Sequence, residues 1–346
     1  MDGNDGRSVS RRQALRITAV TGASLALGGG LVTGLLRRAG LHRVSETRTQ
    51  MGTVVIVTVV DPALEVARSM VRNAFGEMER LESLLSRHRA GTPVARLNAD
   101  GKLREPPPEL LEVMRRARTY SSLTVGAFDV TVAPLLTLYA SRFEAGGAPP
   151  SDNEIDAALE LVDYRRVRID EHAITFDDPR MSVTLDGIAK GYIVDRTVRT
   201  LVTEGAERVL INAGGDMASG GRGSAEDPWT IAIQDPQDVN ASLALVRLGG
   251  ECIATSGDYM QAFTQDRRFH HIIDPRTGRS PDQVSAVTVV TASAMDADAL
   301  STAVMVLGPA EGLELMDRLD NTEGVMVTKA NERLTTSGLG RLSDPR

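Results

Sequence analysis

Asp298 and Thr302 lie in the run Asp298-Ala299-Leu300-Ser301-Thr302, where the apolar spacing predicts a helix. A carboxylate and a hydroxyl at positions i and i+4 share one face of a helix. Both offer hard oxygen atoms, which suit Mg²⁺ or Ca²⁺ better than zinc. The alternative is purely structural, because an acidic residue near a helix start also stabilises the helix dipole. The pair therefore indicates a candidate oxygen-ligand cation site.

Lys190 begins a second predicted helix, directly after the small turn Asp186-Gly187-Ile188-Ala189. Backbone N–H groups, the positive end of the helix dipole and a lysine charge together suit a phosphate. The spacing is not that of a Walker motif. A solvated lysine with no ligand is therefore the alternative.

His270 and His271 are two of the five histidines and are adjacent in the segment 255–278. Turn-forming residues bound this segment, and the apolar pair Ile272 and Ile273 predicts a short buried strand. A histidine at a strand end titrates near neutral pH and suits proton transfer. Alternation along the strand would place His270 on the opposite face from His271. A surface hairpin with incidental histidines is the alternative.

Two further motifs suit a ligand or the core equally well. In Ala127-Phe128-Asp129 the aromatic ring suits either stacking on a planar ligand or filling the core. In Ala213-Gly214-Gly215-Asp216 the paired glycines suit either close approach of the backbone to a ligand or a tight turn.

The elements that carry these groups are a mixture of helices and strands. Helices are predicted at 62–85, 108–120, 132–143, 154–161, 189–203, 296–307 and 310–319. Strands are predicted at 54–60, 166–169, 173–176, 182–185, 209–212, 229–234, 243–248 and 284–291, with a loop at 86–98 and a final hairpin from 324. This order does not alternate as a doubly wound fold does. It predicts a single α+β domain with two lobes.

Composition excludes several classes of protein. The chain has 346 residues, of which 42% are hydrophobic and 25% charged, as in a folded globular protein. The formal net charge is −7, which argues against a nucleic-acid-binding protein. Cys252 is the one cysteine, so an intrachain disulfide and a cysteine-rich metal site are excluded. Its apolar neighbours predict a buried, unreactive thiol.

The N-terminal segment resembles a twin-arginine export signal. Arg11-Arg12 precedes an uncharged, weakly apolar stretch at 17–36. The alternative is a membrane anchor, because the stretch is long enough to span a bilayer and shows no clear A-x-A cleavage site. We therefore expect residues 1–44 to be an export signal or anchor and residues 45–346 to be the working domain. The expected location is extracytoplasmic, in the periplasm or at the outer face of the inner membrane.

Short motifs follow one another in a specific order over about residues 48–335. They are Met51-Gly52-Thr53, Gly126-Ala127-Phe128-Asp129, 187–192, Gly214-Gly215-Asp216, 255–259, 271–278 and 297–302. Together they resemble the ApbE family, the FAD:protein FMN transferases. The resemblance implies an α+β domain of mixed or antiparallel sheets packed with helices, with two lobes around a flavin nucleotide site.

The resemblance also implies an activity. Family members split FAD with Mg²⁺ and transfer FMN to a Ser or Thr hydroxyl of a target flavoprotein, releasing AMP. The acceptor would be an exported or membrane-bound flavoprotein. The alternatives are a Mg²⁺-dependent FAD pyrophosphatase, which forms FMN and AMP, and a non-catalytic protein that binds or delivers FAD.

Site residues are assigned from the matching motifs. Asp298, Thr302 and the Gly187 carbonyl would bind Mg²⁺, and Lys190 would contact the FAD phosphates. His271 would be the base that deprotonates the acceptor hydroxyl, with a nearly neutral pKa. The residues expected to line the flavin nucleotide are Met51, Ala127, Phe128, Asp129, Thr184, His271 and Ile272. Thr184 stands where many family members have aspartate, and the acidic residue of this chain, Asp186, comes two positions later.

Overall fold

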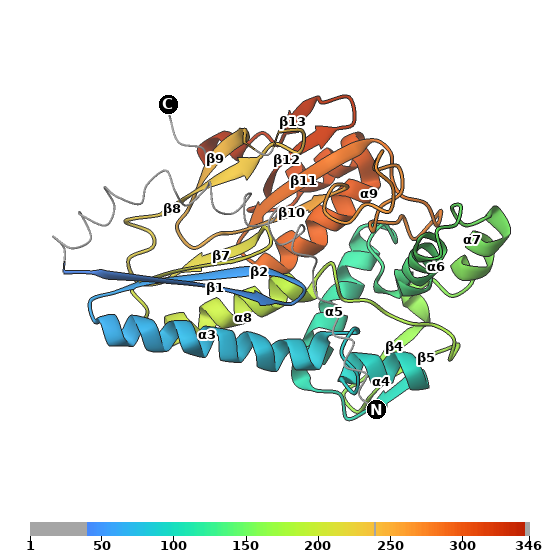
Figure 1. Cartoon of the computed structure of the whole chain (residues 1–346), viewed down its shortest axis with the longest axis horizontal. Helices are drawn as coiled ribbons and strands as arrows, with labels where there is room; N and C mark the ends of the chain where they lie inside the picture. Colours follow the sequence, from blue (N-terminus) through green and yellow to red (C-terminus); the bar gives the residue numbers. More distant parts are fainter. Residues whose placement is uncertain (1–39, 239, 343–346) are drawn as a thin grey trace.

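The computed structural model describes residues 40–238 and 240–342. Its centre is an eight-stranded sheet with the strand order β1-β2-β6-β7-β10-β11-β12-β13 (Figure 1). Every neighbouring pair in this sheet is antiparallel. The strands are β1 (His42–Gln50), β2 (Thr53–Asp61), β6 (Arg208–Ala213), β7 (Asp216–Gly220), β10 (Cys252–Gly257), β11 (Val284–Thr291), β12 (Glu323–Thr328) and β13 (Arg333–Thr335).

Both faces of the central strands are covered. The helices α3 (Leu64–Leu85), α8 (Ala189–Thr203) and α9 (Ala294–Arg318) pack on one face. The hairpin of β8 (Trp229–Gln234) and β9 (Ser242–Leu248) covers the other. On β6, Val209 and Ile211 belong to the helix-side core, whereas Leu210 packs with the hairpin. Because both faces are buried, β2 and β11 are mostly apolar along their whole length.

A smaller lobe lies at the end of the helical layer, on the right in Figure 1. It contains a three-stranded sheet in the order β3-β5-β4. Its elements are β3 (Lys102–Arg104), β4 (Val167–Ile169), β5 (Ala173–Phe176), α4 (Pro93–Asp100), α5 (Pro108–Leu123), α6 (Ala133–Glu144) and α7 (Asp152–Leu159), with the 3₁₀ turns η1 (Val130–Val132) and η2 (Tyr164–Arg166). A third such turn, η3 (Leu339–Arg341), follows β13.

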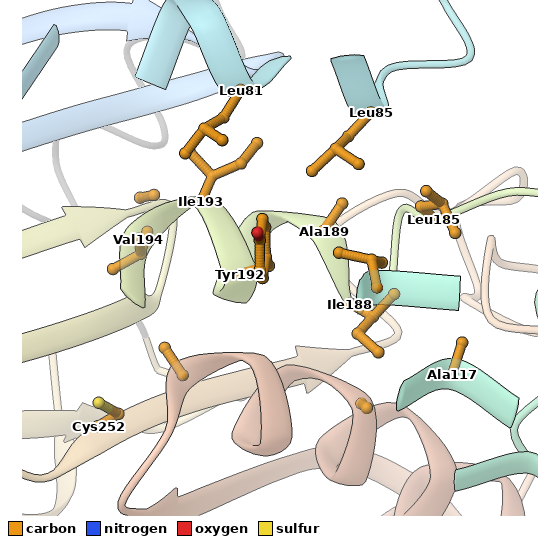
Figure 2. Close-up of a cluster of buried hydrophobic side chains, with 14 of the residues drawn as sticks. Leu81, Leu85, Ala117, Leu185, Ile188, Ala189, Tyr192, Ile193, Val194 and Cys252 are labelled. Atoms are coloured by element: carbon orange, nitrogen blue, oxygen red, sulfur yellow. The ribbon is translucent and has the colours of Figure 1, made fainter. Parts of the chain in front are cut away.

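Helix α8 is buried at the junction of these layers. Ile193 points towards Leu81 of α3, and Ile188 lies towards Ala117 of α5, as Figure 2 shows. The Tyr192 hydroxyl donates a hydrogen bond to Glu112 of α5 at 2.9 Å. On its remaining side α8 contacts α9. The helix is therefore enclosed by other elements along most of its length, which fixes its position.

The predicted α+β fold is confirmed, and most predicted helices are present with small shifts at their ends. The capping box at Ser151 and Glu154 is formed at the start of α7. The break predicted near residue 308 is a kink at Gly308 (φ 81°), which is followed by Pro309. The first described strand, β1, begins at His42, three residues before the expected boundary at residue 45. The predicted export signal lies outside the described residues, except for its last few positions.

Two strand predictions are wrong. Segment 182–185 is not in a sheet. The Val183 amide donates to Asn98 Oδ1, and the Val183 carbonyl accepts from Asn98 Nδ2. The Thr184 amide donates to the carbonyl of Val130. Ile272 and Ile273 are also not in a strand. They are buried in two different apolar clusters. Side-chain packing therefore accounts for their apolar character, although neither residue pairs with another strand.

Other elements were missed. The predicted loop at 86–98 contains the start of α4, whose N-cap Thr92 accepts a hydrogen bond from the Ala95 amide at 3.1 Å. Strands β1, β3, β7 and β10 were not predicted. β1 is an edge strand with mostly polar, partly exposed residues, and such strands lack the apolar signal of a central strand.

Helix α9 is long and apolar enough to span a bilayer by composition. Of its most apolar 18-residue window, 61% is buried inside the fold. Its apolar character therefore belongs to the core, where it packs on β10 and β11.

We expect Gly191→Ala to destabilise the protein. A methyl group at this position would lie 2.2 Å from the carbonyl oxygen of Ala294, so α8 and α9 would have to separate. Overpacking of this kind costs roughly 1–3 kcal/mol or more, measurable by urea denaturation.

Gly76→Ala is the matched control. Gly76 lies on the exposed side of α3, and a methyl group there would meet nothing within 4 Å. This change should stabilise the helix by about 0.5–1 kcal/mol. Equal stability of the two variants would contradict the close helix contact.

Candidate functional site

The candidate site lies where the start of α8 meets the first turns of α9. The Gly191 amide donates a hydrogen bond to Asp298 Oδ2 at 3.0 Å. Gly191 has no side chain, which allows the α9 backbone at Ala294 to approach. Lys190 immediately precedes Gly191, so the predicted lysine and the predicted carboxylate are brought to one place from distant parts of the chain.

Lys190 forms an ion pair with Asp216, at the start of β7. The side chain of Asp216 is 1% exposed, whereas that of Lys190 is 24% exposed. Burial opposes the charged form of Lys190, but the charges of Asp216 and Asp298 outweigh it and raise its pKa. The lysine therefore stays protonated at neutral pH.

Two carboxylates share this lysine. Burial, and then the charge of Asp216, raises the pKa of Asp298 above its ordinary value. Burial likewise raises the pKa of Asp216, although the lysine opposes the effect. Two buried acids that share one lysine repel each other, so the protonated form of one of them is favoured, and a bound cation could replace that proton.

Thr302 and Gly187 lie against each other on the same side of this cluster. A methyl group on Gly187 would lie 3.1 Å from Thr302 Oγ1 and 3.5 Å from the ring of Phe128. Thr302 Oγ1 is also 3.2 Å from Ser256 Oγ, which in turn is 2.8 Å from Ser301 Oγ. Three of the predicted site residues therefore meet here.

The donor set fits Mg²⁺. Asp298 offers a carboxylate, Thr302 a hydroxyl and Gly187 a main-chain carbonyl, and hard oxygen atoms are the ligands that Mg²⁺ prefers. The absence of a side chain at Gly187 keeps the space beside Thr302 open. Among residues 40–238 and 240–342 there is no group of three or more His, Cys, Asp and Glu side chains that suits a metal, so these oxygen donors are the best candidate there.

The loop before α6 supplies the next wall. Phe128 is 5% exposed and Ala127 1%. The carboxylate of Asp129 is fully engaged: it accepts hydrogen bonds from the Thr131 amide and hydroxyl and from the Tyr164 amide at 2.7–2.8 Å. Asp129 therefore holds the shape of the loop.

The segment before α8 continues this wall. The Thr184 amide donates to the carbonyl of Val130 at 2.8 Å, which joins the segment before α8 to the Asp129 loop. Asp186 points outwards, where its carboxylate meets Arg87 at 3.0 Å and His88 at 3.4 Å.

Met51 occupies the tight turn between β1 and β2 with φ 53°, a left-handed conformation that is unusual for methionine. Its amide lies 3.3 Å from Glu82 Oε2. The turn between β6 and β7 packs closely against the β1–β2 turn: a side chain on Gly214 would collide with Thr53. Strain of this kind is common at functional sites.

His271 is held by one carbonyl. The oxygen of Gln261 accepts from the His271 amide at 3.0 Å and lies 3.2 Å from Nδ1. A proton on Nδ1 leaves Nε2 as the free acceptor. Burial, and then the neighbouring His270, lowers the pKa of His271 to about 4. This value lies below the nearly neutral pKa expected from the sequence, because burial and the adjacent His270 both disfavour the charged ring.

The remaining residues of this segment are structural. His270 is 0% exposed, and its Nε2 lies 3.1 Å from the carbonyl of Pro281. Ile272 is 5% exposed and packs in the main core. The charges of Asp186 and Lys190 contribute in opposite directions to the pKa of His271.

Sequence reasoning missed Asp216, Ser256 and Ser301. Asp216 stood in a motif that was noted only for its glycines. Ser256 and Ser301 stood in the motifs 255–259 and 297–302, but residue type and spacing gave neither of them a role. Only the packing of β10 on α9 brings them to Thr302.

A family model described as the ApbE family matches residues 51–326. A FAD:protein FMN transferase of Vibrio cholerae is 32% identical over 295 residues, which cover 82% of this chain and 88% of that protein. The Salmonella typhimurium protein of the same name is 31% identical over 306 residues, covering 85% and 86% respectively.

Solved structures give the same result. The flavin transferase ApbE from Vibrio cholerae superposes with a TM-score of 0.76 at 27% identity, covering 87% of this chain and 99% of that one. The ApbE protein of Thermotoga maritima gives a TM-score of 0.80 at 27% identity, covering 88% and 100%.

We expect the ring of His271 to titrate near pH 4, as followed by NMR of its ring protons, with His271→Gln used to assign the signal. Because the folded state binds this proton less tightly than the unfolded state, His271 should stabilise the fold fully above pH 6.5 and less as the pH falls towards 4. Titration near 6.5 would show that the ring is solvated.

Proposed function

Because this chain belongs to the ApbE family and is a flavin transferase, we propose that it transfers FMN from FAD to a Ser or Thr hydroxyl of a target flavoprotein. AMP is the second product, and Mg²⁺ is required. The observation that carries the proposal is the convergence of Lys190, Asp298, Thr302 and Gly187 on one point, from elements far apart in sequence.

The proposed reaction is a phosphoryl transfer. The acceptor oxygen forms a bond to the FMN phosphorus of FAD, and the bond from that phosphorus to the bridging oxygen breaks. AMP leaves with the electron pair, and the hydroxyl proton passes to His271. Such reactions depend mainly on alignment and on neutralising charge. Mg²⁺, bound by Asp298, Thr302 and the Gly187 carbonyl, would supply part of that neutralisation.

Lys190 supplies the rest of the positive charge. It stays protonated between the two buried carboxylates, and its side chain retains 24% exposure, so a phosphate can reach it. A cation on Asp298 and the ammonium of Lys190 would together offset the charge of a bound phosphate. An acidic protein can therefore bind the dianionic pyrophosphate locally.

The neutral ring of His271 suits the role of general base. A ring with a pKa of about 4 is neutral throughout the physiological range, so its Nε2 can accept a proton there. A low pKa also makes it a weak base at equilibrium. Binding of the FAD phosphates nearby would raise that pKa by adding negative charge.

The flavin nucleotide would be lined by Met51, Ala127, Phe128, Asp129, Thr184, His271 and Ile272. In this group the aromatic ring of Phe128 contacts the Gly187–Thr302 side of the site. Asp129 and Thr184 act through the main-chain shape that they hold. Met51 brings the strained β1–β2 turn to the same region.

A single incubation separates the candidate activities. Purified protein is mixed with FAD, Mg²⁺ and a candidate acceptor flavoprotein. Acceptor that carries covalent FMN after denaturation supports the transferase. FMN and AMP without labelled acceptor would instead support a FAD pyrophosphatase, in which water replaces the hydroxyl, and unchanged FAD would leave only a binding or delivery protein.

We expect Asp298→Ala to lower kcat/KM for transfer by roughly 100-fold or more, because it removes a proposed cation ligand that stabilises developing charge. Asp296→Asn is the control on the same helix, since Asp296 pairs with Arg116 on α5 and does not face the site. If the Asp298 variant is as active as wild type in Mg²⁺, Asp298 is not a Mg²⁺ ligand.

The N-terminal segment and its twin arginines lead us to propose export to the periplasm or the outer face of the inner membrane, where the acceptor would be an exported or membrane-bound flavoprotein. Arg11→Lys with Arg12→Lys should leave the protein in the cytoplasm. Fractionation of cells that express both forms measures this, and unchanged export of the double variant would contradict a twin-arginine route.

A further inference from the structure

Asp195, on α8, binds the first turn of α9 from outside that helix. Its Oδ1 accepts a hydrogen bond from the Ala294 amide at 2.8 Å. Its Oδ2 accepts from the Met295 amide at 2.9 Å and from the Ser293 hydroxyl at 2.8 Å. The first amides of a helix have no partner within it, and a carboxylate there also complements the helix dipole. Asp195 therefore caps α9 in trans.

This contact is one of two that join the same pair of helices. Four positions earlier on α8, the Gly191 amide donates to Asp298, four positions after Ala294 on α9. On each helix the two contact points are one turn apart and lie on one face, with an axial separation of about 6 Å. The two contacts therefore define a single antiparallel register between α8 and α9.

The register matters because each helix carries part of the proposed site. Lys190 precedes the first contact on α8, and Thr302 follows Asp298 by one turn on α9. A shift of α9 along α8 would move the carboxylate and the hydroxyl together, away from Gly187 and Lys190. Asp195 lies outside that cluster, so it would act only through the position of α9.

The chemistry of the contact requires an ionised carboxylate. The Cys252 thiol also lies near, with Sγ 3.5 Å from Asp195 Oδ1, and burial, followed by the charge of Asp195, raises the pKa of that thiol. All groups around Asp195 are thus hydrogen-bond donors. An amide in its place would direct its own N–H groups at donors and lose acceptor capacity.

We propose that Asp195 is a positioning residue: it sets the register of α9 on α8 and so places Asp298 and Thr302 to bind Mg²⁺ opposite Lys190. This inference rests on the proposed function. It goes further by assigning a role to a residue that touches neither the metal ligands nor the substrate.

The test compares Asp195→Asn with Asp296→Asn. Both variants remove a carboxylate charge at the first turn of α9, but Asp296 pairs with Arg116 of α5, away from the α8 interface. Two quantities are measured for each: Mg²⁺ binding by calorimetry, and the Mg²⁺ concentration that half-saturates transfer. Thermal denaturation reports the loss of stability.

We expect Asp195→Asn to weaken Mg²⁺ binding roughly tenfold or more, the usual effect of removing a group that orients metal ligands. The half-saturating Mg²⁺ concentration should rise in parallel, with partial recovery of activity at high Mg²⁺. Asp296→Asn should keep wild-type values. If both variants lose stability but both keep wild-type Mg²⁺ binding, Asp195 is only a helix cap and the inference fails.

Ser293→Ala provides a second test if the Asp195 variant does not fold. It removes one of the four donors to Asp195 and should give a smaller rise in the half-saturating Mg²⁺ concentration. An unchanged value would overturn the inference. A wild-type protein that binds Mg²⁺ but transfers no FMN would refute the proposed function instead, and calorimetry would still decide the role of Asp195.

Discussion

The close contact between α8 and α9 is the constraint on which the site depends. It is possible because Gly191 has no side chain, so the backbone of Ala294 can lie where a Cβ would otherwise be. At this separation the Gly191 amide reaches Asp298, and Asp195 reaches the first amides of α9. The sheet beneath holds both helices in place through β6, β7, β10 and β11. A rigid frame thus supports a site that must align a phosphate, a cation and a hydroxyl.

The same contact concentrates charge in the interior. Asp216 and Asp298 are 1% and 4% exposed, and they share one lysine. Burying two acids for one base opposes folding, since desolvation and mutual repulsion both act against the charged forms. The arrangement is understandable if the protein evolved to bind ligands there. A bound cation would stabilise the charged carboxylates, which links stability at this point to the proposed binding of Mg²⁺.

Much of the fold could be predicted from local pattern. Amphipathic periodicity located α3 and α5, and the Ser151 capping box located α7. β11 was found because both of its faces are buried. The failures have physical causes. β1 is an edge strand with mostly polar residues, so its sequence lacks the apolar pattern that indicates a strand. Ile272 and Ile273 are apolar because two clusters bury them, and no ladder is involved. Val183 is held by the side chain of Asn98, a partner that local sequence cannot reveal.

By itself the sequence determined the types of group available: a lysine at a helix start, a carboxylate and a hydroxyl one turn apart, and an isolated pair of histidines. The order of its motifs also determined the family. Only the tertiary structure decided how these groups act. In the fold, Asp216 pairs with Lys190, and the Asp129 carboxylate holds a loop through hydrogen bonds. Burial lowers the pKa of His271 to about 4. Residue type and spacing fix intrinsic chemistry, whereas desolvation, charge pairing and helix register arise from contacts between segments far apart in the chain.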